Sequence, residues 1–288
     1  MKYMNSKVNL FIVGAAKAGT TSMYEYFNQS SSIYCSEVKE PWYFTDMEKY
    51  TDSKRTANLK EYEALYDFSK ASKYYLDASV SYLAHPQVAH KIWEYNPEAK
   101  IIIMLREPTK RLISYYKMYK KRQGFDCSLK EFIDQTFTAL PKLEAGLYYE
   151  QVKTYIELFK DQVKIIIFEE LIENPKKIEE ELQQFLEIDD LELSMKDKFN
   201  QSKEERFRFA TRFIHQTNPV KDFLKKIVKS RKLKDKVKNS LLQLNEKESS
   251  IQLKTDQETM IWLKNYYQED IIKLEELLGR VISKWHKE

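Results

Sequence analysis

An apolar segment that runs directly into a glycine-containing loop is the feature of this sequence that most constrains its fold. Residues 8–13 (VNLFIV) are mostly apolar, and residues 14–22 (GAAKAGTTS) follow without a break. Apolar residues at helical spacing then predict a helix over residues 20–28. A strand, a glycine loop and a helix in this order are typical of a phosphate-binding loop, in which backbone N–H groups and the positive end of the helix bind anionic oxygens.

The lysine of this loop does not stand where a nucleoside triphosphatase has it. Such enzymes have lysine directly after the second glycine, whereas here Thr20 follows Gly19 and the lysine is Lys17. The apolar residues 101–105 are followed by Arg106 rather than by an aspartate that would hold magnesium. We therefore interpret the loop as a site for a phosphate-like anion that cations and amides bind without a metal. An ordinary strand-to-helix turn is the alternative.

Further apolar segments predict an α/β fold, a three-layer P-loop-like parallel sheet flanked by helices with a helical C-terminal region. Residues 101–105 (IIIML) and 163–168 (VKIIIF) are apolar on both faces, as central parallel strands are. Strands and helices alternate, which favours a parallel sheet. The other predicted strands cover residues 32–35 and 74–77, and the predicted helices cover residues 87–95, 110–122, 148–159 and 176–186.

The C-terminal third of the sequence has a different pattern. Beyond about residue 190 we predict no further strands, and residues 255–285 predict a closing helix with a break at Gly279. We expect residues 1–288 to form one domain, with an α/β core over 1–190 and a mainly helical part of the same domain over 191–288.

Composition and charge narrow the class of protein. Hydrophobic residues make up 42% of the 288 residues and charged residues 32%, which is typical of a soluble chain with a substantial core. A net charge of +4 permits an anionic ligand but does not indicate a nucleic-acid binder. The two cysteines have neither metal-ligand spacing nor a disulfide framework, so we predict a reducing, cytoplasmic location.

One stretch is strongly basic. Residues 221–238 contain nine basic residues against two acidic ones, with apolar residues interspersed at helical spacing. This pattern indicates a solvated helical face, or alternatively a peripheral contact with an acidic membrane or substrate.

Three motifs resemble the signatures of sulfotransferases, namely AAKAGTTS (15–22), KEPWYF (39–44) and LREPTKRLISYY (105–116). Their order and spacing are similar to the family pattern, and GLYYEQVKTYIELF, FEELIENP and LLGRVISKW extend the resemblance over essentially the full chain. The chain looks nearest to the bacterial and carbohydrate-type branch. The resemblance implies that 3′-phosphoadenosine 5′-phosphosulfate (PAPS) donates a sulfonate group to an acceptor hydroxyl by in-line displacement, leaving 3′-phosphoadenosine 5′-phosphate (PAP). It implies no required metal ion.

The resemblance also implies the residues that bind the donor. Those of the loop that would hold the 5′-phosphosulfate are Lys17, Ala18, Gly19, Thr20, Thr21 and Ser22. Lys17 is also a candidate catalytic residue, because an ammonium group stabilises the negative charge that develops on the leaving phosphate oxygen. Arg106 and Ser114 match the family's 3′-phosphate ligands, for which a guanidinium fork and a hydroxyl are suited. Ser202 and Arg206 lie where the family closes a loop over the nucleotide.

The acceptor side is less well defined by the resemblance. Glu40 matches the glutamate that carbohydrate sulfotransferases use as general base, while His85 and His90 are rival bases outside the motif of the histidine-using branch. Trp42 replaces a histidine and Ala78 a lysine that some carbohydrate enzymes have. Both changes make the acceptor side less polar and weaken the case for a heparan-type substrate. The expected acceptor is a carbohydrate or another small molecule, or an apolar alcohol such as a sterol or lipid.

A different class of function also fits the loop. A non-catalytic nucleotide-binding or regulatory module would retain the phosphate loop and perform no transfer. Glu40 distinguishes the two hypotheses, because a protein that only binds the nucleotide has no use for a base beside the phosphosulfate.

Overall fold

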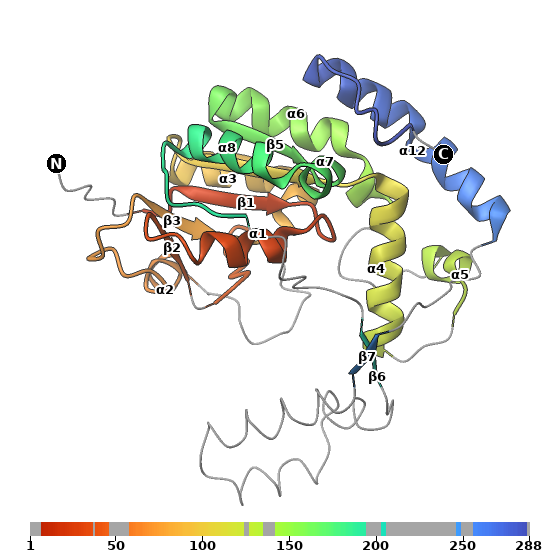
Figure 1. The fold of residues 1–288 in the computed structure, drawn as a ribbon, viewed down its shortest axis with the longest axis horizontal. Helices are drawn as coiled ribbons and strands as arrows, with labels where there is room; N and C mark the ends of the chain where they lie inside the picture. The colour runs from red at the N-terminus through yellow and green to blue at the C-terminus, as the bar shows by residue number, and fades with distance from the viewer. Residues whose placement is uncertain are drawn as a thin grey trace, which may run out of the picture.

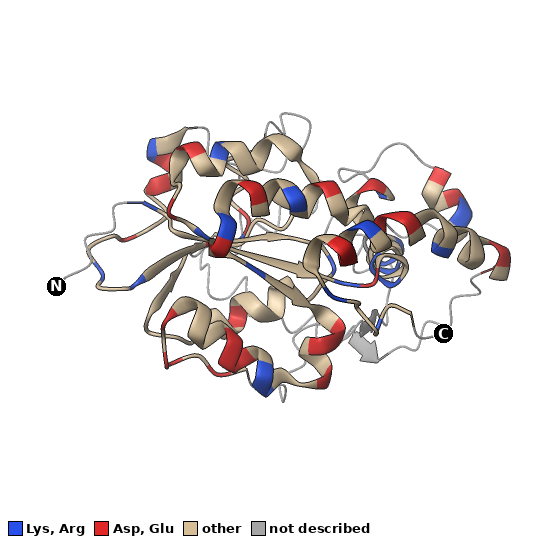
Figure 2. Ribbon diagram, turned by 90° about the horizontal axis from the view of Figure 1, so that it is seen from above, with Lys and Arg blue, Asp and Glu red and all other residues tan. Residues whose placement is uncertain are grey.

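The computed structural model has an all-parallel five-stranded sheet with strand order β2-β3-β1-β4-β5, which confirms the predicted α/β fold (Figure 1). The structure describes residues 7–36, 38–45, 58–123, 127–134, 142–193, 203–205, 246–248 and 256–286. The strands are β1 (Leu10–Gly14), β2 (Ile33–Cys35), β3 (Tyr74–Asp77), β4 (Lys100–Leu105) and β5 (Val163–Ile167). Seen from above, helices lie on both sides of the sheet and complete three layers (Figure 2).

The central strands are buried because their side chains are apolar on both faces. All five residues of β1 are buried, and β4 is buried from Ile101 to its end at Leu105. The registers between β1 and β4 and between β4 and β5 bring the carboxyl ends of these strands to one edge of the sheet. Parallel strands covered by helices need such continuous apolar runs, which is why the sequence located them correctly.

The predicted helices are confirmed to within a few residues, and three shorter ones were not predicted. The described helices are α1 (Thr20–Phe27), α2 (Leu59–Glu63), α3 (Pro86–Tyr95), α4 (Pro108–Gln123), α5 (Leu129–Asp134), α6 (Tyr148–Phe159), α7 (Phe168–Glu173), α8 (Pro175–Leu186) and α12 (Gln257–Leu278). Short 3-10 turns lie at Tyr82–Ala84, Glu144–Gly146 and Lys160–Gln162. The helices α2, α5 and α7 are five or six residues long, too short to show a helical period.

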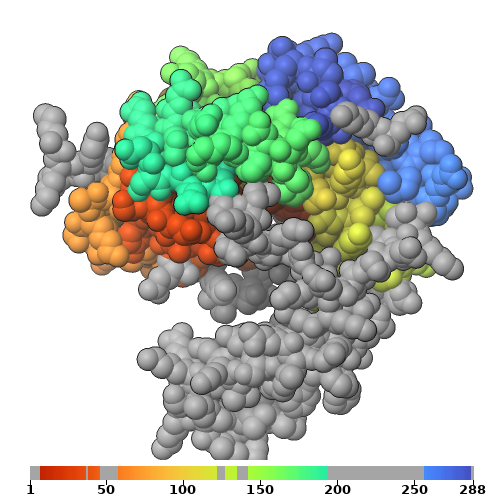
Figure 3. Space-filling model, viewed as in Figure 1, coloured from red at the N-terminus to blue at the C-terminus, as the bar shows by residue number. Residues whose placement is uncertain are grey.

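The closing helix α12 is joined to the α/β core by specific contacts. Asp270 on α12 accepts hydrogen bonds from the backbone N–H groups of Tyr148 (2.6 Å) and Tyr149 (3.2 Å), which caps the start of α6. The helix ends at Gly279, whose φ of 62° places it in the left-handed region that terminates helices. The space-filling view shows α12 against α4 and α6 (Figure 3). The predicted helix is confirmed up to Gly279, but residues 280–285, which were predicted to continue it after the break, are not helical.

The prediction that no strand follows residue 190 is wrong. Lys203–Glu205 (β6) and Glu246–Glu248 (β7) form a two-stranded antiparallel sheet. These triplets contain only charged residues, so they lack the apolar alternation that reveals a strand. Their register pairs Lys203 with Glu248, Glu204 with Lys247 and Glu205 with Glu246. The basic stretch 221–238 lies outside the described residues, and within them no helix is long and apolar enough to cross a membrane.

Candidate functional site

The two glycines of the loop after β1 occupy positions where a side chain does not fit. Gly14 has a φ of 152°, and a Cβ added there would lie 2.7 Å from the Cβ of Leu83. Gly19 has a φ of 87°, and an added Cβ would lie 2.8 Å from the ring of Phe168. The loop is therefore held closely between the turn that follows β3 and the start of α7, with its backbone in conformations that favour glycine.

Helix α1 begins directly after Gly19 with its N-terminal N–H groups at the carboxyl edge of the sheet. As far as the structure describes the chain, no side chain caps this end, and the first turn contains no acidic residue. Thr20 is buried, whereas Thr21 and Ser22 are half-buried. The first turn therefore offers backbone N–H groups and hydroxyls to an anion, in the positive field of the helix terminus.

Lys17 connects the loop to Arg106, which directly follows β4, and to helix α4. The backbone carbonyl of Lys17 accepts a hydrogen bond of 3.2 Å from Nη1 of Arg106, directly after β4. Its ammonium Nζ lies 3.6 Å from Sδ of Met118 on α4. Ser114 lies one helical turn before Met118, and residues four apart share a helix face. The structure thus brings the loop, Arg106 and the Ser114 face of α4 together at the carboxyl edge.

Arg106 is held in a setting that suits an anionic ligand. Its guanidinium lies over the ring of Phe168, 4.8 Å from the ring centroid, and its carbonyl accepts a hydrogen bond of 2.9 Å from the hydroxyl of Tyr148. Burial lowers the pKa of Arg106 below its ordinary value. Its buried Nε has no hydrogen-bond partner among the described residues. A buried cationic donor without an acceptor is costly, so this arrangement fits a ligand that carries phosphate oxygens.

The second part of the site is residues 39–45, here called the Glu40 segment. Oε1 of Glu40 lies 2.7 Å from Nζ of Lys39, and their side chains are 26% and 24% exposed. The backbone N–H of Trp42 donates a hydrogen bond of 3.2 Å to Oγ of Ser79, just after β3. Glu40 is therefore accessible enough to meet a substrate, while the segment that carries it is anchored to the turn after β3.

Unusual backbone conformations are concentrated in these two parts of the site. Five described non-glycine residues have positive φ, and two of them, Lys160 and Glu187, directly follow the helices α6 and α8. The other three are Lys17 (75°), Glu40 (61°) and Trp42 (54°). Such conformations cost about 1–3 kcal/mol each and persist where the surrounding contacts impose them, which is typical of functional sites.

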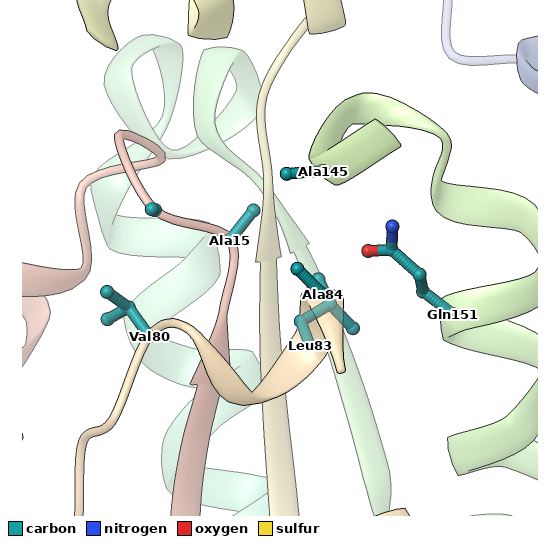
Figure 4. A pocket seen from close by; sticks show the side chains of 7 residues that line it. Ala15, Val80, Leu83, Ala84, Ala145 and Gln151 are labelled. Atoms are coloured by element: carbon teal, nitrogen blue, oxygen red, sulfur yellow. The ribbon is translucent and has the colours of Figure 1, made fainter. Parts of the chain in front are cut away.

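The turn after β3 physically links the loop to the Glu40 segment. Ser79 binds the segment, while the carbonyl oxygen of Val80 would lie 2.9 Å from a Cβ at Gly14. The same turn and the loop line a small apolar hollow that also reaches α6 (Figure 4). The lining residues are Ala15, Ala16, Val80, Leu83, Ala84, Ala145 and Gln151.

The structure says less about the remaining predicted site residues, the two histidines and the residues of the predicted closing loop. His85 directly follows Ala84 of the hollow and is half-buried, whereas His90 is exposed on α3. Ser202 and Arg206 lie outside the described residues. No group of three or more potential metal ligands occurs in the described ranges, and metal independence stays a prediction.

Sequence reasoning missed three residues that shape this site. Phe168 lies against Gly19 and Arg106, Tyr148 binds the carbonyl of Arg106, and Ser79 anchors Trp42. Phe168 is the last residue of one predicted strand and Ser79 closely follows the end of another. Their position is the available signal, because parallel α/β sheets place their sites at the carboxyl edge. The only sequence signal for Tyr148 was its place in the motif GLYYEQVKTYIELF.

Comparisons with known proteins agree with this geometry. Residues 7–243 match the family described as the sulfotransferase domain. The chain belongs to the sulfotransferase family. The crystal structure of a sulfotransferase from Alicyclobacillus acidocaldarius is 25% identical and has a TM-score of 0.71, with 98% of this chain and 99% of that chain covered. The family assignment predicted from the motifs and the fold predicted from the apolar segments are thus confirmed.

Curated sulfotransferases from animals and a slime mould are also similar. The heparan sulfate glucosamine 3-O-sulfotransferase 5 of Mus musculus is 23% identical over 62% of this chain and 52% of its own length. The membrane-associated sulfotransferase kil1 of Dictyostelium discoideum is 27% identical over 38% of this chain and 22% of its own length. A bifunctional heparan sulfate N-deacetylase/N-sulfotransferase of Drosophila melanogaster is 24% identical over 66% of this chain and 20% of its own length. The chain therefore spans about half or less of these relatives.

Proposed function

We propose that this protein is a PAPS-dependent O-sulfotransferase that moves a sulfonate group to an acceptor hydroxyl by in-line displacement. The observation that carries the proposal is the meeting of the glycine loop, the α1 N-terminus and Arg106 at one edge of the sheet. PAPS suits these groups because it is anionic at both ends of its nucleotide, and the buried Nε of Arg106 needs an acceptor. When bound, PAPS supplies the sulfonate group and a phosphate leaving group.

The donor half of the site binds and orients this nucleotide. The N–H groups of Gly19 and of the first turn of α1, with the Thr20, Thr21 and Ser22 hydroxyls, hold the 5′-phosphosulfate. Lys17 stabilises the negative charge that develops on the leaving phosphate oxygen. Arg106 and Ser114 hold the 3′-phosphate, which does not react. A sulfonate group carries less charge than a terminal phosphoryl group, so we propose that these cations and amides suffice without a metal.

Glu40 is the general base in this proposal. It takes the proton of the acceptor hydroxyl as the oxygen attacks sulfur, and to do so it must leave its ion pair with Lys39. The positive φ values of Glu40 and Trp42 favour an enzyme over a nucleotide-binding module, because a protein that only binds the nucleotide gains nothing from holding a glutamate here in a strained backbone conformation.

The acceptor that we propose is a carbohydrate, or an apolar alcohol such as a sterol or lipid. The similarity to heparan sulfate enzymes supports the first. The half-buried Trp42 and Tyr43 in the Glu40 segment support the second. We further propose that residues 1–288 are one sulfotransferase domain, which the coverage of 98% by a solved sulfotransferase supports. The cytoplasmic location and a membrane contact through 221–238 stay predictions.

Incubation of the purified protein with radiolabelled PAPS and a panel of hydroxylated acceptors tests the proposal. The panel contains a heparan-type glycan, simple saccharides, a sterol, a phenol and a long-chain alcohol, and the variant Lys17→Ala is the control. We expect label to appear in at least one acceptor with the wild-type protein and to fall sharply with the variant. PAP binding without transfer to any acceptor would instead support the nucleotide-binding module.

A further inference from the structure

Asp77, at the carboxyl end of β3, is a buried acidic residue that the proposed reaction does not use. Its side chain is 1% exposed, and it accepts hydrogen bonds from three hydroxyl groups. Oδ1 accepts from Oγ of Ser79 at 2.7 Å, while Oδ2 accepts from the hydroxyls of Tyr62 and Tyr82, each at 3.0 Å. Burial, the largest effect, raises the pKa of Asp77 to about 6, although the hydroxyls oppose it. Maintaining a buried carboxylate here is costly, so its contacts need an explanation.

Two of the three hydroxyls also accept hydrogen bonds from backbone N–H groups of the Glu40 segment. Oγ of Ser79 accepts the N–H of Trp42 at 3.2 Å, and the hydroxyl of Tyr82 accepts the N–H of Phe44 at 3.4 Å. A hydroxyl has one proton to donate and lone pairs with which to accept. Because Ser79 and Tyr82 donate their protons to Asp77, their lone pairs are oriented toward these two backbone groups.

We infer that Asp77 is a positioning residue that holds the Glu40 segment in its strained conformation through Ser79 and Tyr82. The inference rests on the proposed function, in which Glu40 is the base. Glu40 and Trp42 both have positive φ, and contacts outside the segment must impose such a conformation. Asp77 does not touch the substrate, because it is buried beneath the turn that it organises. Its effect on catalysis is therefore to keep the Glu40 carboxylate where the acceptor hydroxyl arrives.

Tyr62 provides a matched control within the same network. Its hydroxyl donates to the same Oδ2 of Asp77 at the same distance as that of Tyr82, and both side chains are fully buried. Tyr62 differs in that its contact with the segment is through its ring, which stacks on Tyr43 with the centroids 4.7 Å apart. Tyr62→Phe keeps this stacking and removes a hydroxyl that, unlike those of Ser79 and Tyr82, accepts no hydrogen bond from the described backbone of the segment.

The experiment compares Ser79→Ala, Tyr82→Phe and Tyr62→Phe in the full chain. We expect Ser79→Ala to lower kcat about 10–100-fold, since small displacements of a catalytic group are costly, with a smaller fall for Tyr82→Phe because its bond to Phe44 is longer. Tyr62→Phe should keep kcat within about twofold of the wild type, and all three variants should keep PAP affinity within about twofold. Thermal unfolding should show similar losses of stability, which separates positioning from general destabilisation.

Amide hydrogen exchange of residues 42–45 provides a readout that does not depend on turnover. Exchange at Trp42 should accelerate in Ser79→Ala and exchange at Phe44 in Tyr82→Phe, with both unchanged in Tyr62→Phe. If the wild-type protein transfers no sulfonate, the proposed function fails while these exchange rates still test the anchoring. If transfer occurs but Tyr62→Phe lowers kcat or accelerates exchange as much as Ser79→Ala, the positioning role of Asp77 is overturned.

Discussion

The donor half and the acceptor half of this site are constructed in different ways. The proposed donor half is centred on a short loop between consecutive elements, β1 and α1, which presents mainly backbone N–H groups and the side chain of Lys17. Arg106 joins this loop from the end of β4. The acceptor half is the Glu40 segment, which is held by Ser79 and Tyr82 and, through them, by Asp77. Most of the proposed donor half therefore lies in one short stretch of chain, to which folding adds Arg106, whereas placement of the proposed base depends on several residues that only folding brings together.

The comparison predicts that Glu40→Gln has the largest effect on turnover. Glutamine keeps the shape and a hydrogen-bonding group but does not take the proton, so kcat should fall about 10²–10⁴-fold. PAP affinity should stay within about twofold of the wild type, because the donor half is untouched. Steady-state kinetics and calorimetric titration with PAP measure the two quantities. Near-normal kcat in this variant, together with a large loss in His85→Ala or His90→Ala, would assign the base to a histidine.

Lys17→Ala should have the next largest effect, on the donor side. The ammonium acts on charge that develops during the reaction, so its loss should lower kcat about 10²–10³-fold. Lys17→Arg, which keeps the positive charge, should retain part of the activity. Single-turnover measurements with saturating PAPS separate this effect from binding. A rise of KM for the acceptor with kcat unchanged would show that Lys17 belongs to the acceptor half.

Asp77→Asn should change the pH dependence of stability. The pKa of Asp77 is raised from 3.8 to about 6 in the folded protein, so the folded state binds the proton more tightly than the unfolded state. The raised pKa stabilises the folded protein below about pH 4, and this stabilisation is lost as pH rises through about 6. The free energy of unfolding should fall by about 3 kcal/mol over this range. The wild type should therefore lose stability relative to Asp77→Asn between pH 4 and pH 7. Urea unfolding of both proteins across this range checks the sign, and a constant difference contradicts it.

Arg106→Ala should have the smallest effect of the four, and mainly on binding. Hydrogen bonds to charged groups contribute about 1.5–3 kcal/mol, so PAP affinity should fall about 10–10²-fold. The binding of adenosine 5′-phosphosulfate, which lacks the 3′-phosphate, should be nearly the same in the variant and the wild type. Arg106→Lys serves as a control that keeps the charge but not the forked geometry. Equal losses for the two nucleotides would refute the assignment of Arg106 to the 3′-phosphate.

Much of the architecture was determined by local sequence patterns. The strands β1, β4 and β5 and the helices α1, α6 and α8 were predicted within a few residues, because continuous apolar runs and helical periodicity are properties of neighbouring residues. The glycine loop and the break at Gly279 were also visible, since only a few residue types adopt the backbone conformations found there. These same patterns located Lys17, Arg106 and Ser114 at the end of strands or on the helix that follows.

Only the tertiary structure decided how these elements meet. The strand order, the pairing of β6 with β7, and the hydrogen bond from Arg106 to the carbonyl of Lys17 join residues that are distant in sequence. Asp77 binds the hydroxyls of Tyr62, Ser79 and Tyr82, and this network reaches the Glu40 segment through Ser79. No spacing of residues along the chain predicts it. The left-handed conformations of Lys17, Glu40 and Trp42 have the same origin, because non-glycine residues adopt them where distant contacts outweigh local preference.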